Sequence, residues 1–431
     1  MVVLTMNRTD RMSDFVVEDP PMPAIVDFPT VVKEVLAPFA GLFKNEPERV
    51  HFAEYLTGLL VADKKNVSGI NREFAVTTDQ SCLNRWITTA GTWDAEALNE
   101  ARLAWLQKDP STRYSAQGVI ALDNTLIDHD GKLIEDVGWF WDHAEQRNKI
   151  AHDYLIVNYV CTSGKHYPLE FRRFVKEARC VEEKREFRDH HVLFRELVDW
   201  VIERDIPGDF TFDCYFTHAA NLNHIHASGR GYVGDLKFNR KIVFQGQLLK
   251  AEELAKRIGP EDRKLVMIGQ DRQWCFTKSI KIPDVDHPVR VVILWAGKND
   301  VEARKILVTN RTFWEVTRIL RVYRRRWRGT ECFHRDGKQS RCTSGGMGDC
   351  QLRDGLGQTR HMYMVFLAHS VLMRQLRQSR ASEWALSRLT TIGQACLAVL
   401  KETLSDTISW VVDRVNEGWN GERIRVQLAL P

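Results

Sequence analysis

The chain has 431 residues, more than one ordinary domain, so we expect two or three domains. Its hydrophobic content of 44% and charged content of 27% are typical of soluble globular proteins, and no apolar run approaches the roughly 18 residues of a membrane span. Nine scattered cysteines argue against a disulfide scaffold, and a net charge of +4 does not by itself indicate a nucleic-acid partner. The N-terminus lacks an apolar signal segment, so the expected location is the cytoplasm.

The first part of the chain predicts an irregular leader followed by helices. Within the helices we expect a short helix at about Ser68–Phe74, a turn, and a second helix at about Thr78–Thr88. This pair is compatible with a helix-turn-helix, whose second helix enters a DNA groove, and equally with a small helical bundle. The basic residues expected on its surface are Lys64, Lys65, Arg72 and Arg85.

From Ala116 onward the pattern changes from helix to strand. The buried apolar run Gly118–Leu122 is expected to end at Asp123, and the strand Asp209–Phe216 carries Asp213. Because neighbouring strand ends bring side chains together at one edge of a sheet, the two acids are candidates for one site. Further strands are predicted at Gly138–Asp142, Tyr154–Cys161, His166–Phe174, Gly231–Phe238, Lys264–Ile268, Gln273–Ile280, Val289–Trp295 and Arg304–Thr309, and helices at Glu186–Arg204, Leu248–Ile258, Thr359–Arg377 and Ala381–Lys401.

A helical stripe precedes a third acid. Apolar residues recur at helical spacing at Phe313, Val316, Ile319 or Leu320, Tyr323 and Trp327, and the same stripe continues to Glu331 and Lys338. An inward carboxylate needs a partner such as a metal ion or an arginine. The alternative is an ordinary solvated helix face with a Glu–Arg pair. The opposite face is rich in arginine: Arg318, Arg321, Arg324, Arg325 and Arg328.

Three carboxylates from two strands and a helix can together bind divalent metal. Asp123, Asp213 and Glu331 would supply the hard oxygen ligands that Mg²⁺ and Mn²⁺ prefer. Two such ions about 4 Å apart can activate a water or a 3′-hydroxyl and stabilise the leaving oxygen at a phosphodiester. Metal-dependent chemistry on a polyanion is therefore one hypothesis.

The chain resembles the bacterial insertion-sequence DDE transposases of the branch with a Tyr-Arg-Glu-Lys signature. Asp123-Asn-Thr125 is similar to the first-Asp motif of that family, and Phe210-Thr-Phe-Asp213 followed by Gly231–Lys237 is similar to the second. The third block contains Tyr323, Arg326, Glu331 and Lys338, with the six residues between Glu and Lys that the family has. Segments at Gly58–Lys65 and Gly346–His361 resemble its N-terminal and C-terminal blocks, so the resemblance covers nearly the whole chain.

One spacing departs from the family pattern. Four residues separate Arg326 from Glu331, where the family has three. An extra residue rotates a helix by about 100°, which Gly329 could absorb as a kink. The role of Arg326 is therefore open, and Arg328 is a candidate to replace it.

The resemblance implies an α/β, RNase H-like mixed sheet flanked by helices, with a strand-rich insertion and an N-terminal helical domain. It also implies Mg²⁺, with Mn²⁺ as a substitute, bound by the catalytic acids Asp123, Asp213 and Glu331, and DNA contacts from Tyr323, Arg324, Arg325, Arg326, Arg328 and Lys338. The expected division is a leader (1–28), a helical DNA-binding domain (29–112), a first catalytic part (113–238), an insertion (239–303), a second catalytic part (304–380) and a C-terminal helical region (381–431).

Three functions follow as alternatives. The first is a transposase that cuts transposon ends and joins 3′-hydroxyl ends to target DNA. Its partners would be double-stranded DNA with terminal inverted repeats, target DNA and a second copy of the chain, in the bacterial cytoplasm on nucleoid DNA. The second is a catalytically weakened, transposase-derived regulator that binds DNA. The third is an unrelated metal-dependent nuclease on the same fold, without preference for inverted-repeat ends.

Overall fold

The computed structural model describes residues 24–77, 79–129, 131–143, 145–326, 346–378 and 389–428. The helices are α1 (Thr30–Phe39), α2 (Glu46–Val61), α3 (Val67–Arg72), α4 (Gln80–Thr88), α5 (Ala95–Lys108), α6 (Glu177–Glu182), α7 (His190–Glu203), α8 (Ala219–Ala227), α9 (Ala251–Arg257), α11 (Gly355–Gln378), α13 (Ile392–Asn416) and α14 (Gly421–Gln427), together with residues 316–326, called here the arginine-rich helix. The strands are β1 (Val119–Asp128), β2 (Gly138–Asp142), β3 (Arg147–Val160), β4 (His166–Phe174), β5 (Asp209–Phe212), β6 (Tyr232–Asp235), β7 (Lys241–Phe244), β8 (Gln247–Lys250), β9 (Lys264–Ile268), β10 (Asp271–Ile280), β11 (Val289–Trp295) and β12 (Lys305–Thr309). No helix in these ranges is long and apolar enough to cross a bilayer.

Helices α1 to α4 form a bundle around α2, which is buried along most of its length, and α5 packs against α11 and α1. Asn45 begins α2 by accepting a hydrogen bond from the Glu48 backbone N–H, and α3 and α4 lie close to the positions predicted for the helix pair. The prediction that Lys65 is exposed is wrong. Its side chain is buried because the ammonium donates to the Leu59 carbonyl at 2.6 Å, which satisfies the charge-bearing group inside the bundle.

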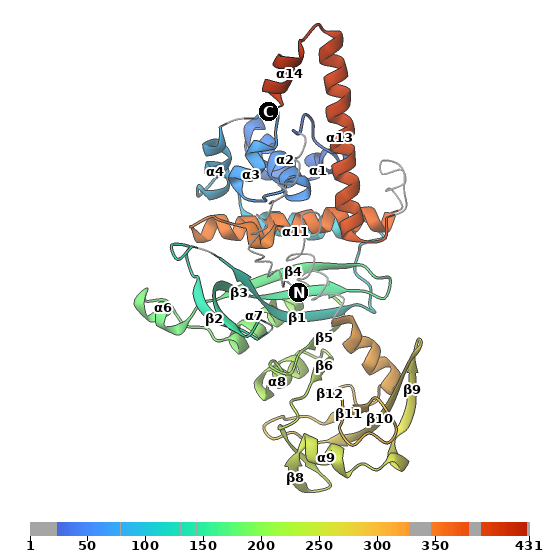
Figure 1. Ribbon diagram of the computed structural model, residues 1–431. Helices are drawn as coiled ribbons and strands as arrows, with labels where there is room; N and C mark the ends of the chain where they lie inside the picture. Colours follow the sequence, from blue (N-terminus) through green and yellow to red (C-terminus); the bar gives the residue numbers. More distant parts are fainter. Residues whose placement is uncertain are drawn as a thin grey trace, which may run out of the picture.

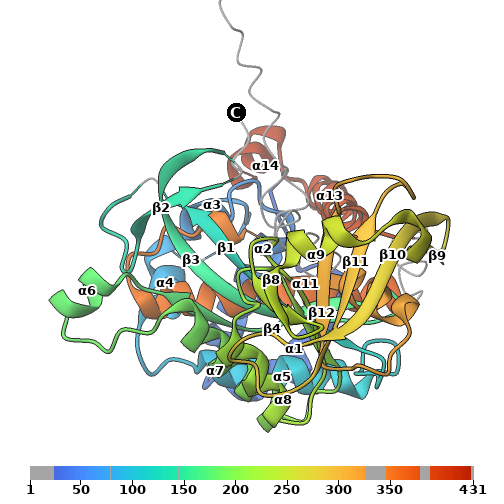
Figure 2. The same cartoon turned by 90° about the horizontal axis from the view of Figure 1, so that it is seen from below.

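A ten-stranded mixed sheet runs through the molecule in the order β2-β3-β1-β5-β6-β12-β11-β10-β9, with β4 also paired to β3. The pairs β1–β5 and β5–β6 are parallel and the others are antiparallel. Figure 2 shows β9 to β12 side by side at one end and β1 to β3 at the other. The predicted α/β fold, an RNase H-like mixed sheet flanked by helices, is confirmed.

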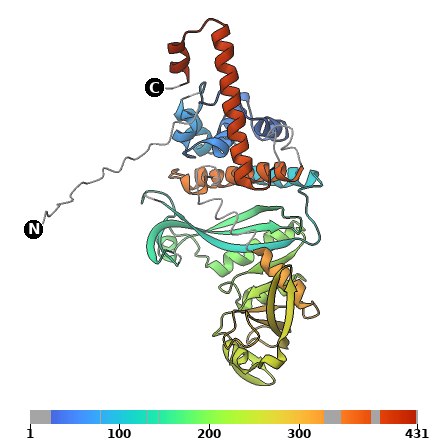
Figure 3. The same ribbon diagram turned by 45° about the vertical axis from the view of Figure 1, so that its right-hand side comes forward.

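Helices cover both faces of the β1–β3–β4 part of the sheet. Helix α11 lies between this part and the N-terminal bundle, and α7 packs on the opposite face (Figure 1, Figure 3). Buried Arg360 of α11 donates to the Ile87 and Thr89 carbonyls at the end of α4, at 3.1 and 2.9 Å. The Arg360 side chain therefore satisfies helix-end carbonyls that the helix itself leaves unpaired.

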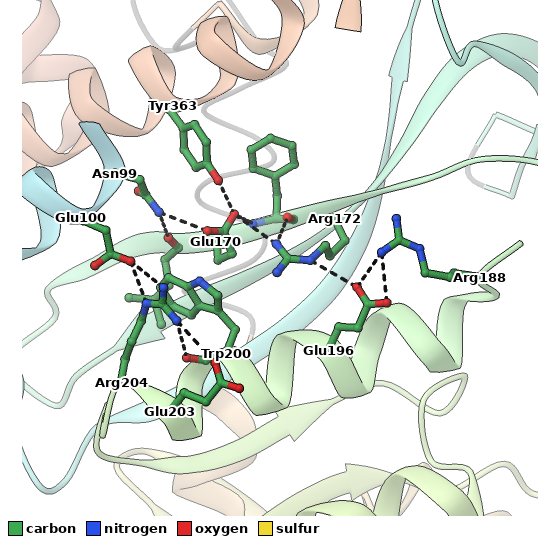
Figure 4. A network of polar contacts seen from close by, with 12 residues as sticks. Asn99, Glu100, Glu170, Arg172, Arg188, Glu196, Trp200, Glu203, Arg204 and Tyr363 are labelled. Carbon is green, nitrogen blue, oxygen red and sulfur yellow. Dashed lines mark hydrogen bonds and ion pairs between the residues drawn. The ribbon is translucent and has the colours of Figure 1, made fainter. Parts of the chain in front are cut away.

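Glu170 in β4 is the centre of a buried polar network, shown in Figure 4. Its carboxylate accepts hydrogen bonds from the Tyr363 hydroxyl of α11 at 2.7 Å and from the Asn99 amide of α5 at 3.3 Å. Arg172 lies 3.5 Å from Glu170 and 3.4 Å from Glu196 of α7. Burial raises the pKa of Glu170 despite these donors. The network thus links the sheet to the helices on both of its faces.

The second half of the sheet packs against the arginine-rich helix. Ile319, Leu320 and Tyr323 are buried in a cluster with Val292 and Leu307. The prediction that Phe313 belongs to the inward stripe is wrong, because the helix begins at residue 316 and Phe313 lies in the preceding turn, 75% exposed. The stripe itself is confirmed from Ile319 to Tyr323.

Helix α13 runs from α11 along the side of the bundle and extends beyond it, as Figure 1 shows. Helix α13 continues for 25 residues and α14 folds back toward α13. The segment after Glu417 continues as α14, which Asn420 caps by accepting from the Arg423 backbone N–H at 2.8 Å. Ile424 is then buried beside Ala24, which fixes the helix on the start of the described chain.

Candidate active site

Strand register brings the two predicted aspartates together. In the β1–β5 pair Ala121 lies opposite Thr211, and Asp123 and Asp213 each follow two residues later. Side chains two residues apart on a strand point to the same face, so Asp123 and Asp213 lie side by side. This position is where the parallel pairing of β1 with β5 stops.

The prediction that the strand ends at Asp123 is wrong. Strand β1 continues to Asp128, because its antiparallel pairing with β3 continues from Asp123 opposite Ile156 to Asp128 opposite Ala151. Asp123 is therefore in the middle of a strand. The convergence with Asp213 depends on β5 being short, since its last residue is Phe212.

A third acid, Asp235, follows in the same row. In the parallel β5–β6 pair Phe212 lies opposite Gly234, so the next positions are Asp213 and Asp235. Asp235 lies in the family-like segment Gly231–Lys237, from which no role was predicted for it. The signal that could have found it is the one used for Asp213, an acid directly after a short apolar run.

Local hydrogen bonds fix Asp213. Its Oδ1 accepts from the Tyr215 backbone N–H at 3.0 Å and from the Phe216 N–H at 3.4 Å, as in an Asx turn. The Thr217 hydroxyl lies within hydrogen-bond distance of the Asp213 carbonyl (3.1 Å) and the Asp235 carbonyl (2.5 Å), which joins the ends of β5 and β6. A Cβ on Gly234 would lie 2.7 Å from the side chains of Phe212 and Thr217, so this junction requires glycine.

Arg326, the last described residue of the arginine-rich helix, lies against the first two acids. Its Nη1 is 2.8 Å from Asp123 Oδ2, and its side chain is buried. Burial lowers the pKa of Arg326, but the charges of Asp123, Tyr323 and Asp213 raise it more, so the pKa lies above the ordinary value. The guanidinium is thus a permanent cation beside both carboxylates.

Tyr323, one turn earlier, contacts the third acid instead. Its hydroxyl donates to Asp235 Oδ2 at 3.2 Å, and Lys305 Nζ lies 2.8 Å from the same oxygen and 3.1 Å from the hydroxyl. Burial raises the pKa of Tyr323, and the charge of Asp235 adds to this effect. Lys305 is a further site residue, and no motif in the sequence predicted it.

The other predicted residues are distributed as follows. Arg324 forms an ion pair with Asp271 at 2.9 Å, and Arg325 donates to the Gln117 carbonyl at 3.0 Å, both at the surface of the arginine-rich helix. Glu331, Arg328 and Lys338 lie outside the described residues.

The chemistry of the acids fits a hard divalent cation. Carboxylate oxygens are the ligands that Mg²⁺ and Mn²⁺ prefer, and the Arg326 guanidinium shows that positive charge is already accommodated beside Asp123 and Asp213. Within the described ranges no group of three or more His, Cys, Asp or Glu side chains is arranged to hold a metal ion. Of the three predicted metal ligands, the described ranges contain Asp123 and Asp213, whose carboxylates are aligned.

Comparison with known proteins agrees with this geometry. Residues 38–271, more than half of the chain, match the family described as DDE superfamily endonuclease. The match includes Asp123, Asp213 and Asp235 and ends before the arginine-rich helix. No curated protein matches the chain. From the aligned acids and this match, the chain belongs to the DDE superfamily endonucleases.

Proposed function

We propose that the protein is a DNA transposase that cuts the ends of an insertion sequence and joins the resulting 3′-hydroxyl ends to target DNA. The family supports a nuclease of the transposase type that acts on DNA. The observation that carries the finer proposal is the alignment of Asp123 in β1 with Asp213 directly after the parallel strand β5, with an arginine from the third sequence block beside Asp123.

In this proposal Asp123, Asp213 and Glu331 would hold Mg²⁺, or Mn²⁺ in its place. The ions would supply Lewis-acid activation of the attacking water or 3′-hydroxyl and stabilisation of the leaving oxygen. The backbone N–H groups of Tyr215 and Phe216 orient Asp213 for this task. Arg324, Arg325, Arg328 and Lys338 would contact DNA phosphates, to which their charges are suited.

Tyr323 and Arg326 are buried, which supports roles for these two signature residues other than direct contact with DNA. Tyr323 would position Asp235 through its hydroxyl, and Arg326 would balance the charge of Asp123 until metal and DNA bind. Coordinated cutting of two ends would require a homodimer on DNA. The enzyme would act in the bacterial cytoplasm on nucleoid DNA.

A second candidate is a regulator that binds DNA and cuts it weakly or not at all. Two observations favour it: the extra residue between Arg326 and Glu331, and the direct ion pair between Arg326 and Asp123. An ion pair at 2.8 Å takes up a carboxylate oxygen that the metal would otherwise use.

The deciding experiment is a cleavage assay on the terminal sequences of the element that encodes the protein, with Mg²⁺, Mn²⁺ or EDTA. We expect metal-dependent nicking by the wild type and its loss in Asp213→Asn, with DNA binding retained. Asp209→Asn is the matched control, because Asp209 lies on the same strand at the opposite end, beside Arg311. Nicking by Asp213→Asn at the wild-type rate would contradict the assignment. Specific binding without nicking by the wild type would establish the regulator.

A further inference from the structure

A pocket of about 450 Å³ lies beside Asp213, outside the carboxyl ends of β5 and β6. The loops that follow these two strands form most of its wall. The side chains that matter for its chemistry are Cys214, Tyr215, His218, Lys237, Arg240 and Lys241. Ligands of α/β proteins commonly bind at this place, where neighbouring parallel strands end.

The pocket is basic. Lys237, Arg240 and Lys241 line it, and none of the three forms an ion pair with another residue in the described part of the chain. Asp284 is the one acid among its lining residues. Three cations that converge on one hollow without internal counter-ions are suited to an anionic ligand with several charges.

One wall is a column of flat rings. Tyr215 stacks on His191 with ring centroids 5.2 Å apart, and His191 stacks on His218 at 4.7 Å. Asn221 fixes His191 by donating to its Nδ1 at 3.0 Å. Burial, and after it the neighbouring His218, lowers the pKa of His191, so this ring is neutral at pH 7 and adds shape rather than charge. Lys237 lies over Tyr215, 5.7 Å from the ring centroid, so the column directs one cation into the pocket.

The pocket adjoins the acids directly. Cys214 lines the pocket and follows Asp213, and Leu236 lines it and follows Asp235. The pocket wall therefore begins one residue after each of these two acids. Phosphates next to the one cut at Asp213 would then lie near the pocket cations.

We propose that this pocket binds backbone phosphates of the DNA strand that adjoins the phosphate to be cut. The inference rests on the proposed function and deepens it, because it names the surface that guides the substrate strand to the acids. The ligand is a phosphodiester chain, and the ring column restricts its path to the side of the pocket that carries Lys237, Arg240 and Lys241.

The test measures equilibrium DNA binding in EDTA, without cleavage, as a function of salt. The pocket variant is Lys237→Gln/Arg240→Gln/Lys241→Gln, and the control is Lys108→Gln/Lys256→Gln/Lys401→Gln, which makes the same charge change at exposed positions of α5, α9 and α13. Each lost phosphate contact lowers the slope of log K against log salt by about 0.9. We expect the pocket variant to lose a slope of about 2 to 3 and the control to keep the wild-type slope. Equal slopes in the wild type and the pocket variant, or equal losses in both variants, would overturn the inference.

The native Cys214 thiol gives a second, local measurement. Bound DNA should slow its alkylation, read by peptide mass spectrometry, at least fivefold, and high salt should abolish this protection. Alkylation of Cys214 is also measured with inorganic phosphate in place of DNA, at a phosphate concentration that does not displace DNA from the protein. Protection by phosphate but not by DNA would overturn the inference, because it would make the pocket a site for free anions.

The two proposals fail in different ways. Loss of salt slope and protection of Cys214 in a protein that never nicks DNA would support the pocket and refute the cutting function. Nicking at the ends with an unchanged slope in the pocket variant would support the function and refute the pocket.

Discussion

The ion pair between Arg326 and Asp123 predicts that one substitution will weaken the metal-free protein and strengthen its binding of metal. Arg326 is buried and Asp123 is partly buried, with Nη1 2.8 Å from Oδ2, and Asp213 directly follows the neighbouring strand β5, which lies about 4.8 Å from β1 by ordinary strand spacing. Arg326→Gln removes the cation and leaves both carboxylates. At an effective dielectric constant of about 20, two charges at this separation repel by roughly 3 kcal/mol.

We therefore expect Arg326→Gln to lower the free energy of unfolding by about 3 kcal/mol in EDTA, within the range for breaking a buried ion pair. In the wild type, Mn²⁺ competes with the guanidinium for Asp123. Without this competitor the dissociation constant for Mn²⁺ should fall at least about tenfold, which corresponds to 1.4 kcal/mol. Added Mn²⁺ should then stabilise the variant more than the wild type, because a ligand stabilises the state it binds.

The assays are chemical unfolding in EDTA and Mn²⁺ titration followed by calorimetry or electron paramagnetic resonance. Arg324→Gln is the matched control, because it removes an arginine from the same helix whose ion pair with Asp271 is solvent-exposed. Such pairs contribute about 1 kcal/mol or less, so this variant should bind Mn²⁺ as the wild type does. Arg326→Lys keeps a positive charge. Its free energy of unfolding and its dissociation constant for Mn²⁺ should therefore lie between those of the wild type and of Arg326→Gln. Unchanged or weaker Mn²⁺ binding by a folded Arg326→Gln variant would refute the competition.

Two further predictions concern carboxyl groups, partly buried Glu73 and buried Glu170. Burial raises the pKa of Glu73 from 4.5 to about 7, with a further contribution from Asp63, so the folded state binds a proton that the unfolded state releases. The stability that this proton contributes is therefore present below about pH 4.5 and is lost as the pH rises through about 7. Glu73→Gln should remove this loss, so the variant should be more stable than the wild type by about 2 kcal/mol at pH 8. Urea unfolding between pH 5 and 8 measures the free energy of unfolding, and Glu96→Gln, at an exposed position, is the control. If the free energies of the wild type and of Glu73→Gln changed in parallel with pH, the raised pKa of Glu73 would be contradicted. Tyr363→Phe should cost about 2 kcal/mol because Glu170 loses a donor at 2.7 Å. The cost should shrink when Glu170→Gln is already present, and additive effects in that double-mutant cycle would show that the contact does not couple the two residues.

Local patterns determined most of the elements that build the site. Strands β9 and β11 begin and end where their short apolar runs predicted them, at Lys264–Ile268 and Val289–Trp295. The buried part of the arginine-rich helix, from Ile319 to Tyr323, was visible from helical spacing alone. Each of these predictions depends on neighbours within a few residues, which is the range over which hydrophobic periodicity carries information.

The arrangement of charges around the acids was decided by tertiary structure. Asp123 and Asp213 were identifiable as acids near apolar strands, but their place in one row with Asp235 depends on the register of two parallel pairs, which no local pattern specifies. Arg326 reaches Asp123 across 203 positions of sequence. The sequence by itself therefore determined which residues could do the chemistry, and long-range strand pairing determined which of them meet, because register and helix docking depend on the burial of whole faces rather than on the residues beside each acid.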